Sequence, residues 1–551
     1  KNVNFLNFLN GSEGKTNFSL KTNLYYQKNK QFIDKNTVIT GAIDNVISNN
    51  LPLGVKLNEG NLKFKYTKDE IFTSGFGNFY NIPTKFTYTQ KKNEDIELFL
   101  KISSNPNLIN FFNKFYDFPI SGKINGIYNI IGNLKSKNFQ INTVSQLEGA
   151  EIELKFLNWK KIRGEKSTLK AIINFEKGKI SKIFGIDFKA KDFSAFGRLS
   201  FDEGKLESGF FEDINFSGNE IKKIMFDKKG QNYYKVTAEG KSLDLVSIRK
   251  NDGISSGKEI DFDITAEKII IDSKISFSGN LIGKTKKNGN GKADLNGSLL
   301  VSNKPIMTEA SIKALFGKSG EYLDGIGLIG GGEAKLSYRP ISKNKNFLTI
   351  VSNSAGKVLT GLNITDTIRN GNLRLETEFS GKSFSKYETT INIEKFNVIE
   401  APKAVRAFSV LSLAGLYSLV EGDGTKFAFG EAKITTNNEY HELNRIKATG
   451  NALGVSLLGN YNKKTKEVDI SGNLIPVNQF SKILGVVPVL GEVLTGLDKT
   501  GVFATQFSIK GNFEDPKVSV NASSLAPGLL RDLFSPDWLI KERERIFGTN
   551  Q

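Results

Sequence analysis

Residues 468–474 read VDISGNL, and apolar and polar residues alternate in them without a break. A period of two over this length is typical of a β-strand with one buried face. Because side chains alternate along a strand, Gly472 falls on the same face as Ile470 and Leu474. The segment therefore predicts a strand whose apolar face has no side chain at Gly472, between Ile470 and Leu474.

The same apolar-x-Gly-x-apolar pattern recurs at residues 120–124, 277–281, 295–299, 470–474 and 509–513. Alternation without the glycine is also widespread, as at residues 62–66 and 96–102. Small residues on the inner face let a sheet bend inward or let another group approach closely. We expect a mainly β protein, with a long, curved, twisted antiparallel sheet forming an open hydrophobic groove. Bulges in a packed sandwich are the alternative explanation of the glycines.

Turns and helices are predicted from different features. The chain has 53 glycines against 12 prolines, which suits many strands joined by tight turns. Four dipeptides predict hairpin turns, namely Asn125-Gly126, Lys177-Gly178, Glu203-Gly204 and Asn370-Gly371. Helical periodicity is rarer. It predicts a helix at residues 107–116 and a few short helices near the C-terminus, at residues 401–420, 479–497 and 536–546.

The composition excludes several kinds of active site. The chain has no cysteine and one histidine, His441. Disulfides, thiolate metal sites, cysteine nucleophiles and sites with two histidines are therefore impossible. Carboxylates are plentiful but lie on alternating polar faces, so no acid–base pair can be named. We expect a protein that is not an enzyme, with no catalytic residues, no cofactor and no metal site.

The net charge of +18 is compatible with a nucleic acid or an anionic membrane surface as partner. Most lysines, however, alternate with apolar residues, as at residues 62–66, which is typical of a solvated strand face. No basic run is interleaved with aromatic residues in the manner of a nucleic-acid module. We therefore expect no nucleic-acid partner.

Residues 325–330 read GIGLIG and match the dinucleotide fingerprint G-x-G-x-x-G. That fingerprint requires a strand before it and a helix after it. Here Gly331, Gly332 and a strand-like segment at residues 334–338 follow instead. The match therefore does not predict a cofactor site.

Two apolar stretches, residues 408–420 and 483–497, stand out from the alternating background. Both are shorter than the roughly 20 residues that a membrane-spanning helix needs. Two interpretations stay open. The stretches pack against the body of the protein, or they lie on a membrane or a lipid.

The last 200 residues or so resemble the C-terminal region of the AsmA-like family of bacterial envelope proteins, within the bridge-like lipid transfer superfamily. The resemblance is carried by short blocks in a fixed order, at residues 354–359, 368–375, 396–402, 411–416, 450–454, 472–476, 484–491, 511–516 and 525–534. It implies a β-groove without catalytic residues that carries phospholipid between the inner and outer membranes and supports outer-membrane assembly and barrier integrity. It also implies a periplasmic location in a Gram-negative bacterium, with an inner-membrane anchor helix that this chain does not contain.

Four segments and two sets of residues follow from these expectations. The segments are an N-terminal groove segment (1–250), a middle groove segment (251–400), an AsmA-like C-terminal region (401–534) and a charged helical tail (535–551). The predicted lipid-groove residues are Leu62, Phe64, Ile96, Leu98, Leu100, Phe277, Val468, Ile470, Phe507 and Ile509. The predicted membrane or end contacts are Leu411, Leu413, Leu416, Leu484, Val487 and Leu490.

Two other classes of protein compete with lipid transfer. An outer-membrane β-barrel, or another structural envelope protein, also alternates apolar and polar residues. The chain shows no girdle spacing of its aromatic residues, which disfavours the barrel. A polysaccharide-acting β-solenoid enzyme needs clustered carboxylates and a regular coil repeat, and neither is visible.

Overall fold

The computed structural model describes most of the chain between residues 12 and 521. It does not describe residues 1–11, 23, 27–31, 35–36, 52–54, 80, 92–94, 106–119, 134–135, 155–156, 158, 247–256, 273, 318–319, 343–344, 381–384, 400–423, 451–452, 477–504 and 522–551. The four predicted helices lie outside the described residues, as do the six predicted membrane or end contacts.

The described residues form one open sheet of 29 strands, with a separate three-stranded and a separate two-stranded sheet. The predicted mainly β fold is confirmed. The chain divides into two compact units, residues 1–273 with 284–289, and residues 274–283 with 290–551. The predicted segment boundaries at 250, 400 and 534 stay predictions.

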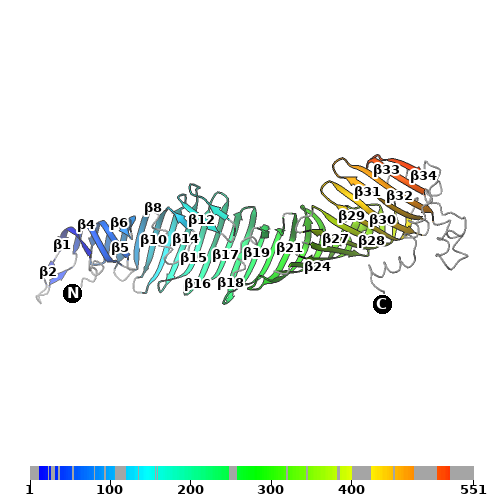
Figure 1. The fold of residues 1–551 in the computed structure, drawn as a ribbon. Coiled ribbons are helices and arrows are strands. Elements are labelled where there is room, and N and C mark those ends of the chain that lie inside the picture. Colours follow the sequence, from blue (N-terminus) through cyan, green and yellow to red (C-terminus); the bar gives the residue numbers. More distant parts are fainter. Residues whose placement is uncertain are drawn as a thin grey trace, which may run out of the picture. The chain divides into compact units, whose positions relative to one another are not determined.

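Long strands lie side by side in the first unit (Figure 1). Its main-sheet strands are β1 (Ser12–Lys21), β4 (Val38–Leu51), β5 (Val55–Tyr66), β6 (Glu70–Phe79), β7 (Ile82–Lys91), β8 (Ile96–Asn105), β10 (Ile124–Asn133), β11 (Asn138–Gln146), β14 (Thr168–Glu176), β15 (Lys179–Lys189), β16 (Phe193–Asp202), β17 (Lys205–Phe216), β18 (Asn219–Gly230), β19 (Tyr233–Asp244) and β20 (Glu259–Ile270). Its small sheets are β2 (Leu24–Tyr26) with β3 (Phe32–Asp34), and β9 (Ile120–Gly122) with β12 (Ala150–Leu154) and β13 (Trp159–Lys161).

The second unit is built in the same way and, among its described residues, adds one helix. Its strands are β21 (Ile275–Thr285), β22 (Gly291–Val301), β23 (Lys304–Gly317), β24 (Gly320–Ile329), β25 (Gly332–Ser342), β26 (Lys345–Ser352), β27 (Ile368–Ser380), β28 (Tyr387–Val398), β29 (Thr425–Thr436), β30 (Tyr440–Gly450), β31 (Leu453–Asn462), β32 (Glu467–Pro476), β33 (Thr505–Asn512) and β34 (Lys517–Asn521). The last two residues of β21 belong to the first unit. The helix is α3 (Ala355–Gly361), and its residues Ala355, Val358 and Leu359 are buried.

Pairing is antiparallel between neighbouring strands, with one exception among the described pairs. β19 and β20 run parallel, with Val236 opposite Phe262. The predicted antiparallel sheet is therefore mixed, with a parallel pair at this point. A parallel pair needs a connection of a dozen or more residues, and the chain between Asp244 and Glu259 provides one.

Two of the four predicted hairpin turns are confirmed. Lys177-Gly178 joins β14 to β15, and Glu203-Gly204 joins β16 to β17, each with both residues at positive φ. Asn125-Gly126 lies inside β10, where Gly126 pairs with Ser145. Asn370-Gly371 lies inside β27, although both residues have positive φ. In both strands the pairing with neighbours overrides the local turn preference.

The small sheet of β9, β12 and β13 packs on one rim of the first unit. Trp159 is 3% exposed, and its ring centroid lies 4.6 Å from that of Phe193 and 6.0 Å from that of Phe188. Its Nε1 donates a hydrogen bond of 3.1 Å to Asp192. Gly122, with φ of 99°, turns the chain from the small sheet into β10, so the glycine pattern at 120–124 spans two strands.

Candidate functional site: one apolar face in each unit

Strand β8 shows how the sequence separates the two faces of the sheet. Ile96, Leu98, Leu100 and Ile102 alternate with polar or exposed residues, so all four lie on one face. Leu98 lies opposite Tyr88 on one side and Ile130 on the other. Apolar positions of neighbouring strands are therefore in register.

This register continues from β5 to β20. The residues that follow one another across these strands, here called the first apolar row, are Phe64, Thr73, Tyr88, Leu98, Ile130, Ile141, Ile173, Ile183, Leu199, Gly209, Phe226, Val236 and Phe262. Neighbouring strands are about 4.8 Å apart, so the row extends over roughly 55 Å. The periodicity of each strand and its register together produce a nearly unbroken apolar line.

The first apolar row is only partly covered by protein. Most of its side chains, including those of Ile141, Ile173 and Ile183, are half-buried. Nearer the rim that carries the small sheet, the same face becomes a closed core around Leu147, Trp159 and Phe216, each at most 3% exposed. One part of the face is thus packed by the chain itself, and the row beside it retains accessible apolar surface.

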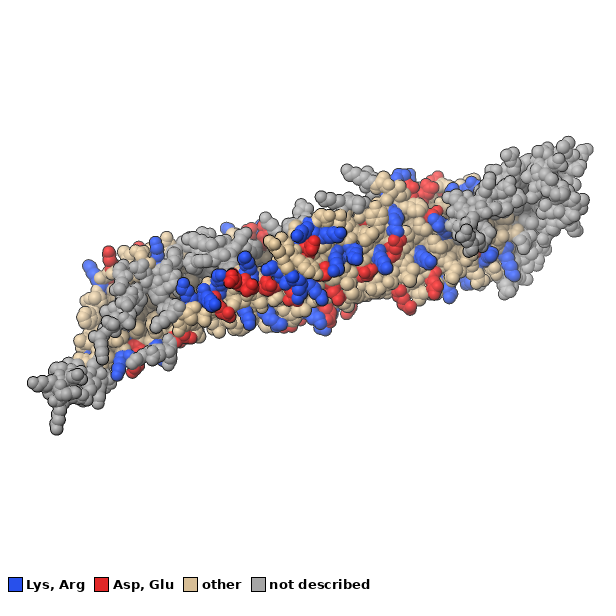
Figure 2. Space-filling view, turned by 90° about the horizontal axis from the view of Figure 1, so that it is seen from below, with Lys and Arg blue, Asp and Glu red and all other residues tan. Residues whose placement is uncertain are grey.

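The opposite face of the first unit carries charged side chains together with exposed apolar ones such as Phe99, Ile127 and Val144. Lys223 and Glu239 lie opposite each other on β18 and β19, with 2.5 Å between Nζ and the carboxylate. Hydrogen bonds from Lys223 and Lys222 lower the pKa of Glu239. Figure 2 shows basic and acidic side chains intermixed on the face that it draws. Such exposed pairs keep a strand face soluble and add little to stability.

The second unit has its own apolar rows. The second apolar row runs from β22 to β33 and consists of Leu295, Ile312, Gly325, Leu336, Ile350, Leu375, Ile391, Ala432, Ile446, Leu457, Gly472 and Phe507. Beside it, half-buried Leu348, Ile434 and Ile470 belong to a parallel line on the same face. Most of the second apolar row is buried, including Ile312 and Leu375, so the accessible apolar surface of the second unit lies mainly in this parallel line.

The predicted groove residues have two kinds of environment. Leu62, Ile96, Phe277, Val468, Phe507 and Ile509 are buried, with Phe277 at 0% exposure. Phe64, Leu98, Leu100 and Ile470 are half-buried. The half-buried ones retain surface for a ligand, and the buried ones form the packed floor around them. Their assignment to a lipid groove stays a prediction.

Sequence inspection missed most of the first apolar row. Ile141, Ile173, Ile183 and Phe226 belong to it. Ile141 and Ile173 lie in stretches with apolar alternation, which could have identified their strands. Ile183 and Phe226 directly adjoin apolar Phe184 and Met225, so alternation does not assign them to a face. The register that lines them up comes from strand pairing and its bulges, which a single strand does not reveal.

The imidazole of His441 is held in place by contacts with neighbouring side chains. Its ring nitrogen Nδ1 lies 2.8 Å from the hydroxyl of Thr436, and its ring stacks on Tyr461 at 5.9 Å between centroids. Burial, helped by the charge of Lys463, lowers its pKa and favours the neutral imidazole. Within the described ranges, no group of three or more acidic or histidine side chains is arranged to hold a metal ion.

Comparisons with family models, with curated proteins and with solved structures find no match. In the part of the chain that the structure describes, no helix has both the length and the hydropathy needed to cross a bilayer.

Proposed function

We propose that this protein carries phospholipid without a chemical step, by shielding acyl chains against the apolar face of each unit. The observation that carries the proposal is the row of half-buried apolar side chains, in register from strand to strand. A soluble surface rarely exposes so long a contiguous apolar line unless something apolar covers it.

The energetics favour a continuous apolar surface over a single pocket. Exposing an acyl chain to water costs about 0.8 kcal/mol per methylene. A chain that slides from one strand to the next exchanges one apolar contact for an equal one, so the barrier between neighbouring positions stays low. The headgroup stays in water at the open side of the face.

The cellular setting is part of the same proposal. The resemblance to AsmA-like envelope proteins supports transfer between the inner and outer membranes, in the periplasm of a Gram-negative bacterium. The membranes and the acyl chains would then be the partners, and the role would be outer-membrane assembly and barrier integrity.

The test uses the full chain purified from its native envelope, with co-purified phospholipid measured by native mass spectrometry. Leu98→Asp and Ile470→Asp place a charge on the apolar face of each unit and should lower the bound lipid severalfold. Phe99→Asp is the matched control, because Phe99 is 38% exposed on the opposite face of the strand that carries Leu98. Unfolding midpoints of all three variants identify any loss caused by misfolding. Equal lipid in the Leu98, Ile470 and Phe99 variants would refute the proposal.

A further inference from the structure

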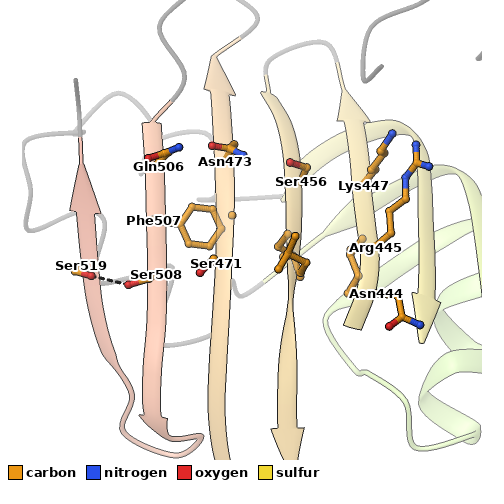
Figure 3. Close-up of a pocket in the computed structure, with 14 residues that line it drawn as sticks. Asn444, Arg445, Lys447, Ser456, Ser471, Asn473, Gln506, Phe507, Ser508 and Ser519 are labelled. Carbon is orange, nitrogen blue, oxygen red and sulfur yellow. Dashed lines mark hydrogen bonds between the residues drawn. The ribbon is translucent and has the colours of Figure 1, made fainter. Parts of the chain in front are cut away.

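The second unit contains a cavity of about 570 Å³ that is lined by both polar and apolar residues (Figure 3). It lies over strands β30 to β34, and we call it the polar pocket. Its lining includes Arg445, Lys447, Ser456, Asn473 and Gln506. A cavity of this size is in the range of small-molecule sites.

The strand register arranges these side chains in lines. Lys447 lies opposite Ser456, Ser456 opposite Asn473, and Asn473 opposite Gln506. Figure 3 shows the four side chains side by side across the strands. Ser471, Ser508 and Ser519 form a second line, in which the hydroxyls of Ser508 and Ser519 are 2.7 Å apart. Leu458 lies opposite Ser471 in this second line, so the floor of the polar pocket combines hydroxyl and amide groups with an exposed apolar side chain.

Two buried atoms of the lining lack hydrogen-bond partners within the protein. They are Nε of Arg445, which can only donate, and Oδ1 of Asn473, which can only accept. Buried polar atoms are nearly always paired, because leaving them unpaired costs free energy. A ligand that satisfies both atoms must offer an acceptor and a donor.

The charge of the lining selects the acceptor. Arg445 and Lys447 are basic, and no carboxylate lines the polar pocket. Glu431 is buried directly opposite Lys447 on β29, and one of its oxygens lies 3.6 Å from Nζ of Lys433. Glu431 therefore offsets the positive charge of the neighbouring lysines. Arg445 then gives the lining of the polar pocket its net positive charge. Guanidinium groups bind phosphate oxygens with strong, charge-assisted hydrogen bonds.

We propose that the polar pocket binds a phosphate ester of a polyol. The phosphate lies at Arg445, and the hydroxyl groups of the ligand donate to Asn473 and contact Gln506 and the serines. Such a group occurs in free polyol phosphates and in the headgroup of a phosphoglycerol lipid. The polar pocket shares Ile446, Leu457, Gly472 and Phe507 with the second apolar row. The proposed contacts are made by other, polar residues of the lining, so the inference does not rest on the proposed function.

Isothermal titration calorimetry of the full chain tests the proposal, with glycerol 3-phosphate as the probe. Glycerol 3-phosphate should bind saturably, and glycerol alone should not. Arg445→Gln should weaken binding at least tenfold, because it removes a charge-assisted hydrogen bond. Gln506→Ala, at an exposed side chain, should weaken it a few-fold without affecting the fold.

Lys510→Gln is the matched control. Lys510 is exposed on the same face, outside the polar pocket, and its Nζ lies 3.3 Å from a carboxylate oxygen of Asp469. This variant loses the same charge and should bind glycerol 3-phosphate as the unmodified chain does. Equal weakening by Arg445→Gln and Lys510→Gln would overturn the proposal. So would the absence of saturable binding, or inorganic phosphate binding as tightly as glycerol 3-phosphate.

Dihexanoyl-phosphatidylglycerol distinguishes the two sources of the ligand. Binding at least as tight as that of glycerol 3-phosphate supports a lipid headgroup as the occupant. Weaker or absent binding of this lipid, with glycerol 3-phosphate retained, supports a free polyol phosphate.

Discussion

Phe507 lies directly opposite Gly472, and its ring occupies the space that a side chain at position 472 would need. A Cβ built on Gly472 would also lie 2.6 Å from the carbonyl oxygen of Ser456. The glycine in the VDISGNL segment therefore makes room for a neighbouring aromatic ring, as aromatic residues do beside glycines in other sheets. At this position the missing bulk is filled by the protein itself.

Gly472→Ala should accordingly lower the free energy of unfolding by about 1–3 kcal/mol, because overpacking displaces Phe507 and the neighbouring backbone. Urea unfolding measures this effect. Phe507→Leu combined with Gly472→Ala should recover part of the loss, since the shorter side chain relieves one of the two clashes. An unchanged midpoint for Gly472→Ala alone would show that the ring moves without cost.

Helix α3 depends on a second close approach. A Cβ on Gly361 would lie 2.7 Å from the Cα of Gly330, at the turn between β24 and β25. Backbone on both sides leaves no flexible group to yield, so Gly361→Ala should destabilise the second unit by about 1–3 kcal/mol. Lys357→Ala, at an exposed position of the same helix, is the control and should change stability by less than about 0.5 kcal/mol. Denaturant unfolding of the two variants makes the comparison.

Lys161 should make stability depend on pH in the alkaline range. Its side chain is 0% exposed, and Nζ donates hydrogen bonds of 2.8 Å to Ala150 and 3.1 Å to Ile162 carbonyls. Burial lowers its pKa below the ordinary 10.5, against smaller opposing effects of Glu165 and Glu148. Between the lowered pKa and 10.5 the unfolded chain binds more protons, so this residue's contribution makes stability rise with pH.

The measurement is the free energy of unfolding against pH for the unmodified chain and for Lys161→Met. The difference between the two curves isolates Lys161 from the other lysines and the tyrosines. The free energy of unfolding of the unmodified chain should rise relative to that of Lys161→Met as the pH approaches 10.5. Two parallel curves would contradict the prediction.

Protonation of His441 should make the stability of the fold depend on pH near neutrality, and the chain has no other histidine. Its pKa in the folded protein is lowered below 6.5 by burial and by Lys463. The unfolded chain therefore takes up a proton first as the pH falls below 6.5, and folded stability decreases through that range. His441→Gln should remove this slope. An NMR titration of the imidazole gives the pKa directly, and a value at or above 6.5 would contradict the prediction.

Much of the strand content could be predicted from sequence, because residues such as Leu98 and Ile470 sit in clear alternation. The line that Leu98 forms with Ile130 and Ile141 could not, since it depends on the register of separate strand pairs and on bulges between them. The same cause explains Asn125-Gly126, a turn by local preference that strand pairing holds inside β10.

The polar pocket was missed for a different reason. Ser456, Asn473 and Gln506 are ordinary polar positions of alternating strands, and each taken alone predicts only a solvated face. Their alignment across strands, beside the buried guanidinium nitrogen of Arg445, exists only after the sheet has formed. A site made of single residues from several strands leaves no motif in the sequence.

The single parallel pair described above also bears on how the protein folds. Elsewhere each main-sheet strand pairs with the main-sheet strand that follows it, so contacts are mostly local in sequence and the sheet can grow one strand at a time, as repeat proteins do. Between β19 and β20 the chain must first run back to the side of the sheet at which β19 begins, because the two strands are parallel. Closing this longer connection costs additional conformational entropy. Growth of the sheet should pause at this pair, which makes it the natural border between an early-folding and a late-folding part.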